Sequence, residues 1–322
     1  MKKLILMLFC AVLIPANGFS GVTYFDYKYH AVEGELDEAA FSVIRSYLTY
    51  QEDLGDGLSY KFQTDIDYKS SPFNVYLKNA KVDWICDLGK ATIGMQGMNA
   101  FNVQEKTWGH RFLEKSPMDK HGFANSADMG FGFKRSINDI TLSITYTNGG
   151  GYKKTEEDKY KKTTLQAFWG KSKLNKNAGF NLGGMYSLEP LSDDGDNVSV
   201  FGGFVGFSNE KLRFGLEYDM KSTNISTDAV TEQIIAFYSN YKVNSSLEAL
   251  IYIDMFDPWT DSVDNSDTVD IDESKDNETY VIAGFNCSPA KSLIISPNIR
   301  MTSFENGSES DLVYKLNFQF KF

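Results

Sequence analysis

Sixteen segments in which apolar and polar side chains alternate recur along this chain, and they constrain its fold more than any other feature. Strict alternation places the apolar side chains on one face of an extended strand. Most of the segments have about the length that a tilted strand needs to cross a bilayer, roughly 9–11 residues. We predict strands at residues 22–31, 41–52, 58–68, 75–86, 90–98, 126–135, 139–147, 162–171, 178–188, 197–207, 211–220, 231–242, 245–256, 278–287, 292–302 and 312–322.

The connections between these segments are alternately short and long. The short ones are rich in Gly, Asn, Asp, Ser and Pro, which tight turns favour. The long ones are residues 32–40, 69–74, 99–125, 148–161, 189–196, 221–230, 257–277 and 303–311. Short turns on one side and long loops on the other are typical of transmembrane barrels. The sequence therefore predicts an all-β fold, an antiparallel up-and-down transmembrane β-barrel of sixteen strands. Segments 197–207 and 231–242 alternate poorly, so their register stays open.

The last nine residues show the alternation most clearly. Polar residues Lys315, Asn317, Gln319 and Lys321 separate the apolar residues Tyr314, Leu316, Phe318, Phe320 and Phe322. An edge strand of a soluble sheet is the alternative interpretation, but an aromatic terminus brings little to a chain end that frays in water. The ending resembles the C-terminal signal by which bacterial outer-membrane barrels are recognised for insertion. We predict that the five apolar residues form an assembly signal read by the barrel-assembly machinery.

The N-terminus predicts export. Lys2 and Lys3 precede an apolar run from Leu4 to Ile14, and small residues follow. This pattern predicts a signal peptide at residues 1–20, cleaved near residues 18–20, and a single barrel domain at residues 21–322. We expect the protein in the outer membrane of a Gram-negative bacterium, in contact with lipid and lipopolysaccharide, with both termini periplasmic. The net charge of −11 argues against nucleic acid as a partner.

A barrel of this many strands leaves a water-filled channel, because side chains cannot fill its interior. The alternation predicts lumen-lining charges of both signs, so ion selectivity stays open. They are Arg45, Lys61, Asp65, Asp67, Lys81, Asp83, Lys134, Arg213, Glu217, Asp219, Glu248, Asp254, Arg300 and Lys315. Cys86 and Cys287 fall six strands apart, too far for a disulfide, and we expect two free thiols.

The long connection 99–125 differs from the others because it is rich in cations. It contains Lys106, His110, Arg111, Lys115 and Lys120. We predict that this third loop folds inward and that these five residues constrict the pore, where their charges set the field that an ion meets. The alternative is an exposed loop without a role in the pore.

Several segments resemble the phosphate-selective porins. They are residues 41–45 (FSVIR), 53–63 (DLGDGLSYKFQ), 78–83 (KNAKVD), 93–97 (IGMQG), 108–111 (WGHR) and 125–130 (NSADMG). The resemblance covers residues 22–135. It implies an outer-membrane porin that passes small hydrophilic solutes or ions by passive diffusion and that forms a homotrimer. That family lines its phosphate pores with ladders of arginine and lysine, whereas the charges predicted for this lumen are mixed.

Catalytic and cofactor motifs are missing from the sequence. His30, His110 and His121 are the only histidines, and no serine lies in a nucleophile motif. The chain has no glycine-rich phosphate loop, zinc-ligand cluster or CxxC pair. We expect no enzyme, no cofactor and no metal site. The acidic loop 257–277 lacks the spacing of a calcium loop, and divalent-cation binding there stays open. Two alternatives to a porin are a non-conducting structural or adhesive outer-membrane barrel and an outer-membrane hydrolase.

Overall fold

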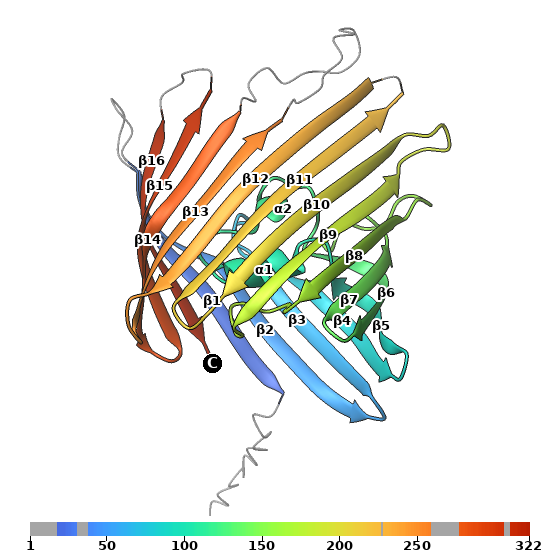
Figure 1. Cartoon of the computed structure of the whole chain (residues 1–322), viewed down its shortest axis with the longest axis horizontal. Helices are drawn as coiled ribbons and strands as arrows, with labels where there is room; N and C mark the ends of the chain where they lie inside the picture. Colours follow the sequence, from blue (N-terminus) through green and yellow to red (C-terminus); the bar gives the residue numbers. More distant parts are fainter. Residues whose placement is uncertain (1–17, 31–37, 227, 259–276, 306–309) are drawn as a thin grey trace, which may run out of the picture.

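The strands of the computed structural model form one closed barrel (Figure 1), in which each strand pairs with its neighbours in sequence and β1 pairs with β16. The structure describes residues 18–30, 38–226, 228–258, 277–305 and 310–322. Its strands are β1 (Phe19–His30), β2 (Glu38–Gly55), β3 (Leu58–Asp67), β4 (Asn74–Cys86), β5 (Gly89–Gly97), β6 (Ala127–Ile137), β7 (Ile140–Thr147), β8 (Lys162–Gly170), β9 (Gly179–Pro190), β10 (Asn197–Ser208), β11 (Leu212–Ile225), β12 (Asp228–Lys242), β13 (Leu247–Asp257), β14 (Glu278–Ala290), β15 (Leu293–Phe304) and β16 (Asp311–Lys321). The predicted sixteen-strand antiparallel barrel is confirmed.

Some boundaries differ from the prediction. The expected long connection 221–230 is mostly strand, since β11 continues to Ile225 and β12 begins at Asp228. The predicted acidic loop and most of the predicted signal peptide lie outside the described residues.

The two ends of the chain close the barrel. The pairing of β1 with β16 runs from Val22 opposite Lys321 to His30 opposite Val313. Beyond it, the amide and carbonyl of Gly21 each hydrogen-bond to the backbone of Phe322 at 3.1 Å. The terminal strand is therefore the seam of the barrel.

The outer wall is apolar, as the alternation predicts. Large side chains such as Phe131, Leu142, Leu165 and Leu182 are exposed on neighbouring strands, although an exposed apolar belt of this kind is costly in water. Not every large aromatic residue faces outward, since Tyr280 on β14 points inward into a buried cluster and is 9% exposed. The wall is uneven, because β7 has 8 residues and β12 has 15.

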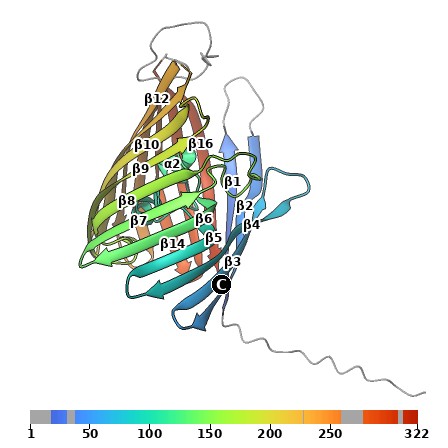
Figure 2. The same cartoon turned by 90° about the vertical axis from the view of Figure 1, so that its right-hand side faces the viewer.

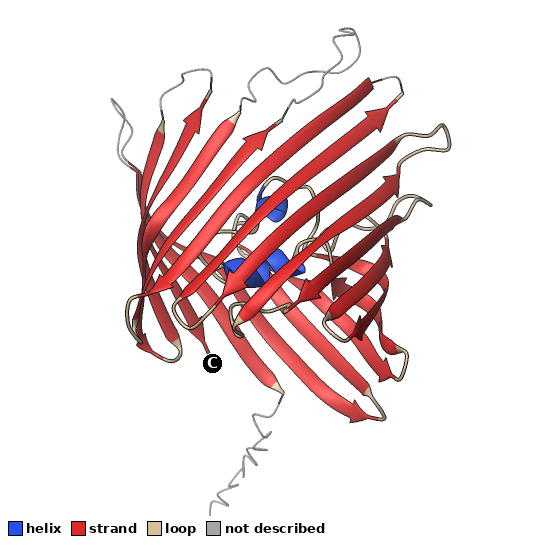
Figure 3. Cartoon of the chain, in the orientation of Figure 1, coloured by secondary structure: helices blue, strands red, loops and turns tan. Residues whose placement is uncertain are grey.

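The third loop folds into the barrel, as predicted, and carries α1 (Asn102–Trp108) and α2 (Pro117–Lys120) (Figure 3). Trp108 and Phe112 belong to a buried cluster with Tyr238, Tyr252 and Ile282 of the wall. No helix of the described residues is long and apolar enough to cross a membrane.

A second cluster under the loop explains the two strands that alternate poorly. Met118 and Phe123 of the loop pack with Val200 on β10 and Ile234 on β12. Phe201 on β10 and Ile235 on β12 face outward and are exposed. Both faces of these strands are apolar because the inner face is a packed core rather than a water-lined wall.

The wall splits between β2 and β3. Their pairing ends at Leu48, so the first part of β2 pairs only with β1. Figure 2 shows this part of β2 standing apart from the β3–β4 hairpin. The buried carboxylate of Asp65 lies at the split. It accepts hydrogen bonds from Arg45 Nη1 and Tyr76 Oη, each at 2.9 Å, and from the Ser46 amide at 3.4 Å. The side chain thus satisfies the Ser46 amide, a backbone donor that a continuing ladder would have paired.

Candidate functional site

The third loop is anchored where it leaves β5. The Asn99 amide nitrogen donates to Ser143 Oγ at 3.1 Å and to the Thr164 carbonyl at 3.3 Å. Its amide oxygen accepts a hydrogen bond from Thr145 Oγ1 at 2.9 Å. These bonds to β7 and β8 turn the chain inward across the barrel.

Arg300 on β15 holds the middle of the loop. Its guanidinium lies 3.1 Å from Glu114 Oε2 and donates to the Leu113 carbonyl at 2.8 Å. It also donates to Asn317 Oδ1 at 3.2 Å. The Arg300 side chain is only 7% exposed, and a buried charge of this kind is tolerated when its donors are satisfied.

His110 fixes the loop to β11 and β13. Its Nε2 lies 2.5 Å from Glu248 Oε1. Arg213 donates to the neighbouring Trp108 carbonyl at 3.1 Å. Burial lowers the pKa of His110, and the contact with Glu248 opposes this shift. The imidazole therefore anchors the loop to the wall and does not present a charge to either of the two cavities beside the loop.

Lys120 fixes the end of α2. Its Nζ lies 3.0 Å from Asp254 Oδ1 and 3.0 Å from Glu278 Oε1, and 4.0 Å from the centre of the Tyr280 ring. Ligand atoms of His121, Asp254 and Glu278 all lie within 4.8 Å of one another, which is a spacing that could hold a metal ion. The Lys120 ammonium already supplies a cation between the two carboxylates, so these residues do not offer a free metal site.

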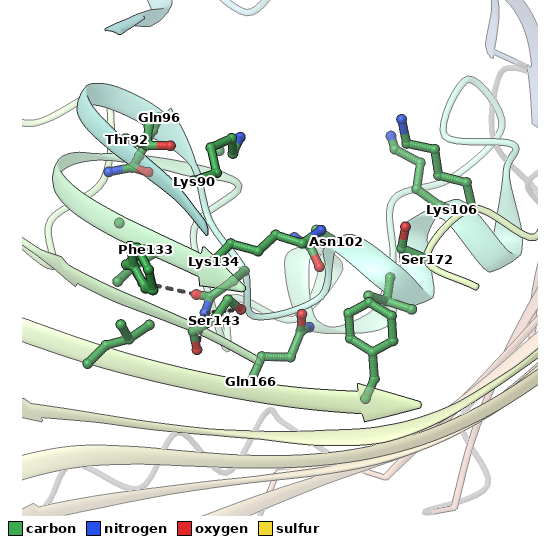
Figure 4. Close-up of a pocket in the computed structure, with 18 residues that line it drawn as sticks. Lys90, Thr92, Gln96, Asn102, Lys106, Phe133, Lys134, Ser143, Gln166 and Ser172 are labelled. Carbon is green, nitrogen blue, oxygen red and sulfur yellow. Dashed lines mark hydrogen bonds between the residues drawn. The ribbon is translucent and has the colours of Figure 1, made fainter. Parts of the chain in front are cut away.

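Two neighbouring cavities lie beside the loop. The side cavity, of about 200 Å³, lies against β5 to β8 and is lined by Lys90, Gln96, Lys134, Ser143 and Gln166 among others (Figure 4). The central cavity, of about 480 Å³, extends from Lys78 to Lys321. Asn102, Lys106 and Lys173 line both, so the two cavities lie side by side.

The charge on these walls is almost all positive. The cations that line the two cavities are Lys61, Lys78, Lys90, Lys106, Arg111, Lys134, Lys173, Lys176 and Lys321. Among the described residues that line them, Glu105 is the one carboxylate. Burial favours a raised pKa for Glu105, but the Arg111 and Lys106 charges outweigh it and hold the pKa below its usual range. Glu105 therefore stays ionised and forms ion pairs with Lys106 and Arg111 of the same loop.

The structure separates the five residues predicted to constrict the pore. Lys106 and Arg111 line the central cavity. His110 and Lys120 are held by carboxylates of the wall. Lys115 lies outside both cavities, and its carbonyl accepts a hydrogen bond from Tyr252 at 3.4 Å.

The charges predicted to line the lumen fall into three groups. Lys61 and Lys134 line the cavities. Several form pairs along the wall: Arg45 with Asp65, Lys81 with Asp83, and Lys315 with Asp26, while Asp67 accepts a hydrogen bond from the Lys69 amide. The third group lies against or beneath the loop and lines neither cavity: it comprises Arg213, Glu217, Asp219, Glu248, Asp254 and Arg300.

Sequence reasoning missed several cations that line the cavities. Lys173 and Lys176 belong to a turn, for which alternation assigns no face. Lys78 lies at a bulge, where the pairing of β3 with β4 shifts between Gln63 and Thr64. The bulge leaves both Lys78 and Asn79 buried, at 5% and 7% exposure, because an extra residue breaks the two-residue period.

No protein-family model matches the chain, and no curated protein matches its sequence. Solved structures do resemble it over 94% of its length. OmpF of Salmonella typhi, in a complex with daunomycin, has a TM-score of 0.69 at 12% identity, with 97% of that chain covered. An anion-selective porin from Comamonas acidovorans has a TM-score of 0.63 at 10% identity, with 98% covered. A loop L8 deletion mutant of OmpT, an outer membrane protein of Vibrio cholerae, has a TM-score of 0.63 at 12% identity, with 98% covered. At these identities the likeness establishes the fold, which this chain shares with bacterial outer-membrane porins.

Proposed function

We propose that the protein is an outer-membrane porin through which small hydrophilic solutes and ions diffuse passively, with a preference for anions. The observation that carries this proposal is the charge on the two cavities, where nine cations accompany the single carboxylate of Glu105. Charges on a narrow wall of low dielectric set the local potential and raise the concentration of ions of opposite sign.

The distribution of acids supports the same preference. Glu217, Asp219 and Asp254 are at most 1% exposed and lie under the loop rather than along the cavities. The inner wall carries charges of both signs. Because the loop covers these acids, the charged residues that still line the cavities are mainly cations. The net negative charge of the whole chain therefore does not describe the field along the path of a solute.

The outer surface of the barrel also supports the proposal that the protein lies in a membrane. Its outward face carries the large apolar residues that lipid favours, and its structural neighbours are bacterial outer-membrane porins. The proposal includes contact with lipopolysaccharide, insertion by the barrel-assembly machinery, a cleaved signal peptide, periplasmic termini and a homotrimer. One neighbouring structure of Vibrio cholerae OmpT is described as a trimer form.

An enzymatic role has less support. The three histidines each lie against a carboxylate: His30 against Asp311, His110 against Glu248, and His121 against Asp254. His110 and His121 are buried parts of the loop anchor. The polar side chains that contact His110 include Glu248, Arg213 and Asn286, and those that contact His121 include Asp254 and Lys120; none of these carries the hydroxyl or thiol of a nucleophile.

Planar-bilayer recording tests the proposal. The purified protein should give a steady open-channel current, and its reversal potential in a potassium chloride gradient should have the sign expected for chloride preference. Absence of current at every voltage would instead support the non-conducting structural barrel. A reversal potential of the opposite sign would refute the argument from the cavity charges.

A further inference from the structure

We propose that the side cavity is a binding site for a phosphorylated monosaccharide. This site rests on the proposed function, because the ligand must reach it through the channel. The cavity is far larger than the roughly 10–15 Å³ that a single water needs, and it is closed on one side by β5 to β8 and on another by α1. It shares Asn102, Lys106 and Lys173 with the central cavity. The proposal places entry of the solute at these three side chains.

Lysines make one part of the side cavity a phosphate site. Lys90, Lys134 and Lys173 all line this cavity, and Lys134 is close enough to Lys90 and to Lys173 for its charge to be repelled by each of them. Lys90 is partly compensated by Asp83 at 3.3 Å. Lys134 and Lys173 have no carboxylate partner among the described residues. A dianionic phosphate placed between these ammonium groups would relieve the repulsion and accept several charge-assisted hydrogen bonds.

Neutral polar groups form the rest of the wall. Thr92, Gln96, Asn102, Ser143, Gln166 and Ser172 line it. Gln166 is 4% exposed, and its amide nitrogen has no hydrogen-bond partner among the described residues. Figure 4 shows its side chain rising from β8 toward Asn102. A buried donor without a partner is costly, and a ligand oxygen would satisfy it.

The combination identifies the class of ligand. Inorganic phosphate would use the lysines alone and leave Gln166 unsatisfied. A neutral sugar would use the amides and hydroxyls and leave the lysines uncompensated. Phe168 also lines the cavity, but it packs with Val103 and Phe204 and is only 4% exposed. A sugar that carries a phosphate matches both the lysines and the neutral polar groups.

Block of the open-channel current tests this site. Glucose 6-phosphate, inorganic phosphate and glucose are added to the wild-type channel at the same ionic strength. Glucose 6-phosphate should block at a concentration about tenfold lower than inorganic phosphate, since the sugar adds more than one hydrogen bond. Equal block by the two phosphates would overturn the site.

Variants assign the two halves of the ligand to their residues. Gln166→Leu should weaken the block by glucose 6-phosphate by about three- to tenfold and leave the block by inorganic phosphate unchanged. Lys134→Gln should weaken both. Gln319→Leu is the matched control, because Gln319 lines only the central cavity and is also buried; it should change neither.

The outcomes separate this proposal from the proposed function. An anion-selective current with no preference for glucose 6-phosphate, or an equal effect of Gln166→Leu and Gln319→Leu, refutes the sugar-phosphate site alone. Absence of current refutes the porin proposal, and cation preference in potassium chloride refutes its preference for anions; either result removes the sugar-phosphate site as well.

Discussion

Arg300 on β15 and Glu114 in the third loop form a buried ion pair, with Nη1 and Oε2 3.1 Å apart, that joins the barrel wall to the loop inside it. The same guanidinium donates to the Leu113 carbonyl and to Asn317. One side chain thus fixes the backbone and a carboxylate of the loop together, and the loop decides which wall residues remain open to solutes.

Removing this anchor should destabilise the barrel. Arg300→Met leaves the Glu114 carboxylate, which is 18% exposed, without its cation. Removing one partner of a fully buried pair typically costs about 3–5 kcal/mol, and access of water to Glu114 lowers that cost here. We expect a lower unfolding temperature and a noisier open-channel current as the loop detaches. Lys159→Met is the control, because Lys159 and Asp193 form an exposed pair and exposed pairs contribute little. An equal loss of stability in both variants would argue against the anchor.

Charge changes within the loop should depend on position. Lys106→Gln removes a cation that lines both cavities and should move the reversal potential toward zero. Lys115→Gln, in the same loop but outside the cavities, should leave it unchanged. The measurement is the reversal potential of each variant in the same salt gradient. A matching shift in the two variants would show that the loop acts through its total charge and not through its cavity-lining residues.

Replacing Lys120 should create a metal site. In Lys120→Ala, the ligand atoms of His121, Asp254 and Glu278 stay within reach of one ion, while the ammonium that lies 3.0 Å from both carboxylates is gone. Zinc accepts such nitrogen and oxygen ligands. We expect zinc to raise the unfolding temperature of Lys120→Ala and not that of the wild type, measured by thermal denaturation. His121→Ala added to the variant should abolish the effect. Equal stabilisation of the wild type by zinc would contradict the prediction, because it would show that the Lys120 ammonium does not prevent metal binding.

Loss of the terminal residue should impair assembly before it alters conduction. Phe322 makes two backbone hydrogen bonds with Gly21 next to the seam, and it completes the alternation of β16. Deletion of Phe322 should reduce the amount of folded barrel in the outer membrane, measured by heat-modifiable gel mobility of membrane fractions. Lys321→Gln, which keeps the terminal aromatic residue, is the control. Normal insertion of the truncated chain would contradict the assembly role.

The two cysteines should remain free. Cys86 and Cys287 are both free in the structure, as the strand count predicts. Unfolded protein should therefore run at the same position on reducing and non-reducing gels. A faster band without reductant that is lost in Cys86→Ser would show a disulfide. It would contradict both the two free thiols and the strand order.

The sequence by itself determined the barrel, because that part of the fold follows from local rules. Alternation assigns each side chain to a face, and turn residues end each strand; thus Phe320 faces outward and Gln319 inward. The inward course of the third loop also follows from its length and position. Those rules use only neighbours in sequence, so they hold for every regular strand.

Only the tertiary structure decided which inward residues face open space. Alternation treats Lys134 and Glu217 alike as lumen residues. In the folded protein Lys134 lines a cavity, while Glu217 is 1% exposed beneath the loop. The difference arises because Met118, Trp108 and their neighbours cover one side of the lumen through contacts between residues far apart in the chain. Burial by a remote segment leaves no periodic signal in the strand that it covers, except where it turns the inner face apolar, as in β10 and β12.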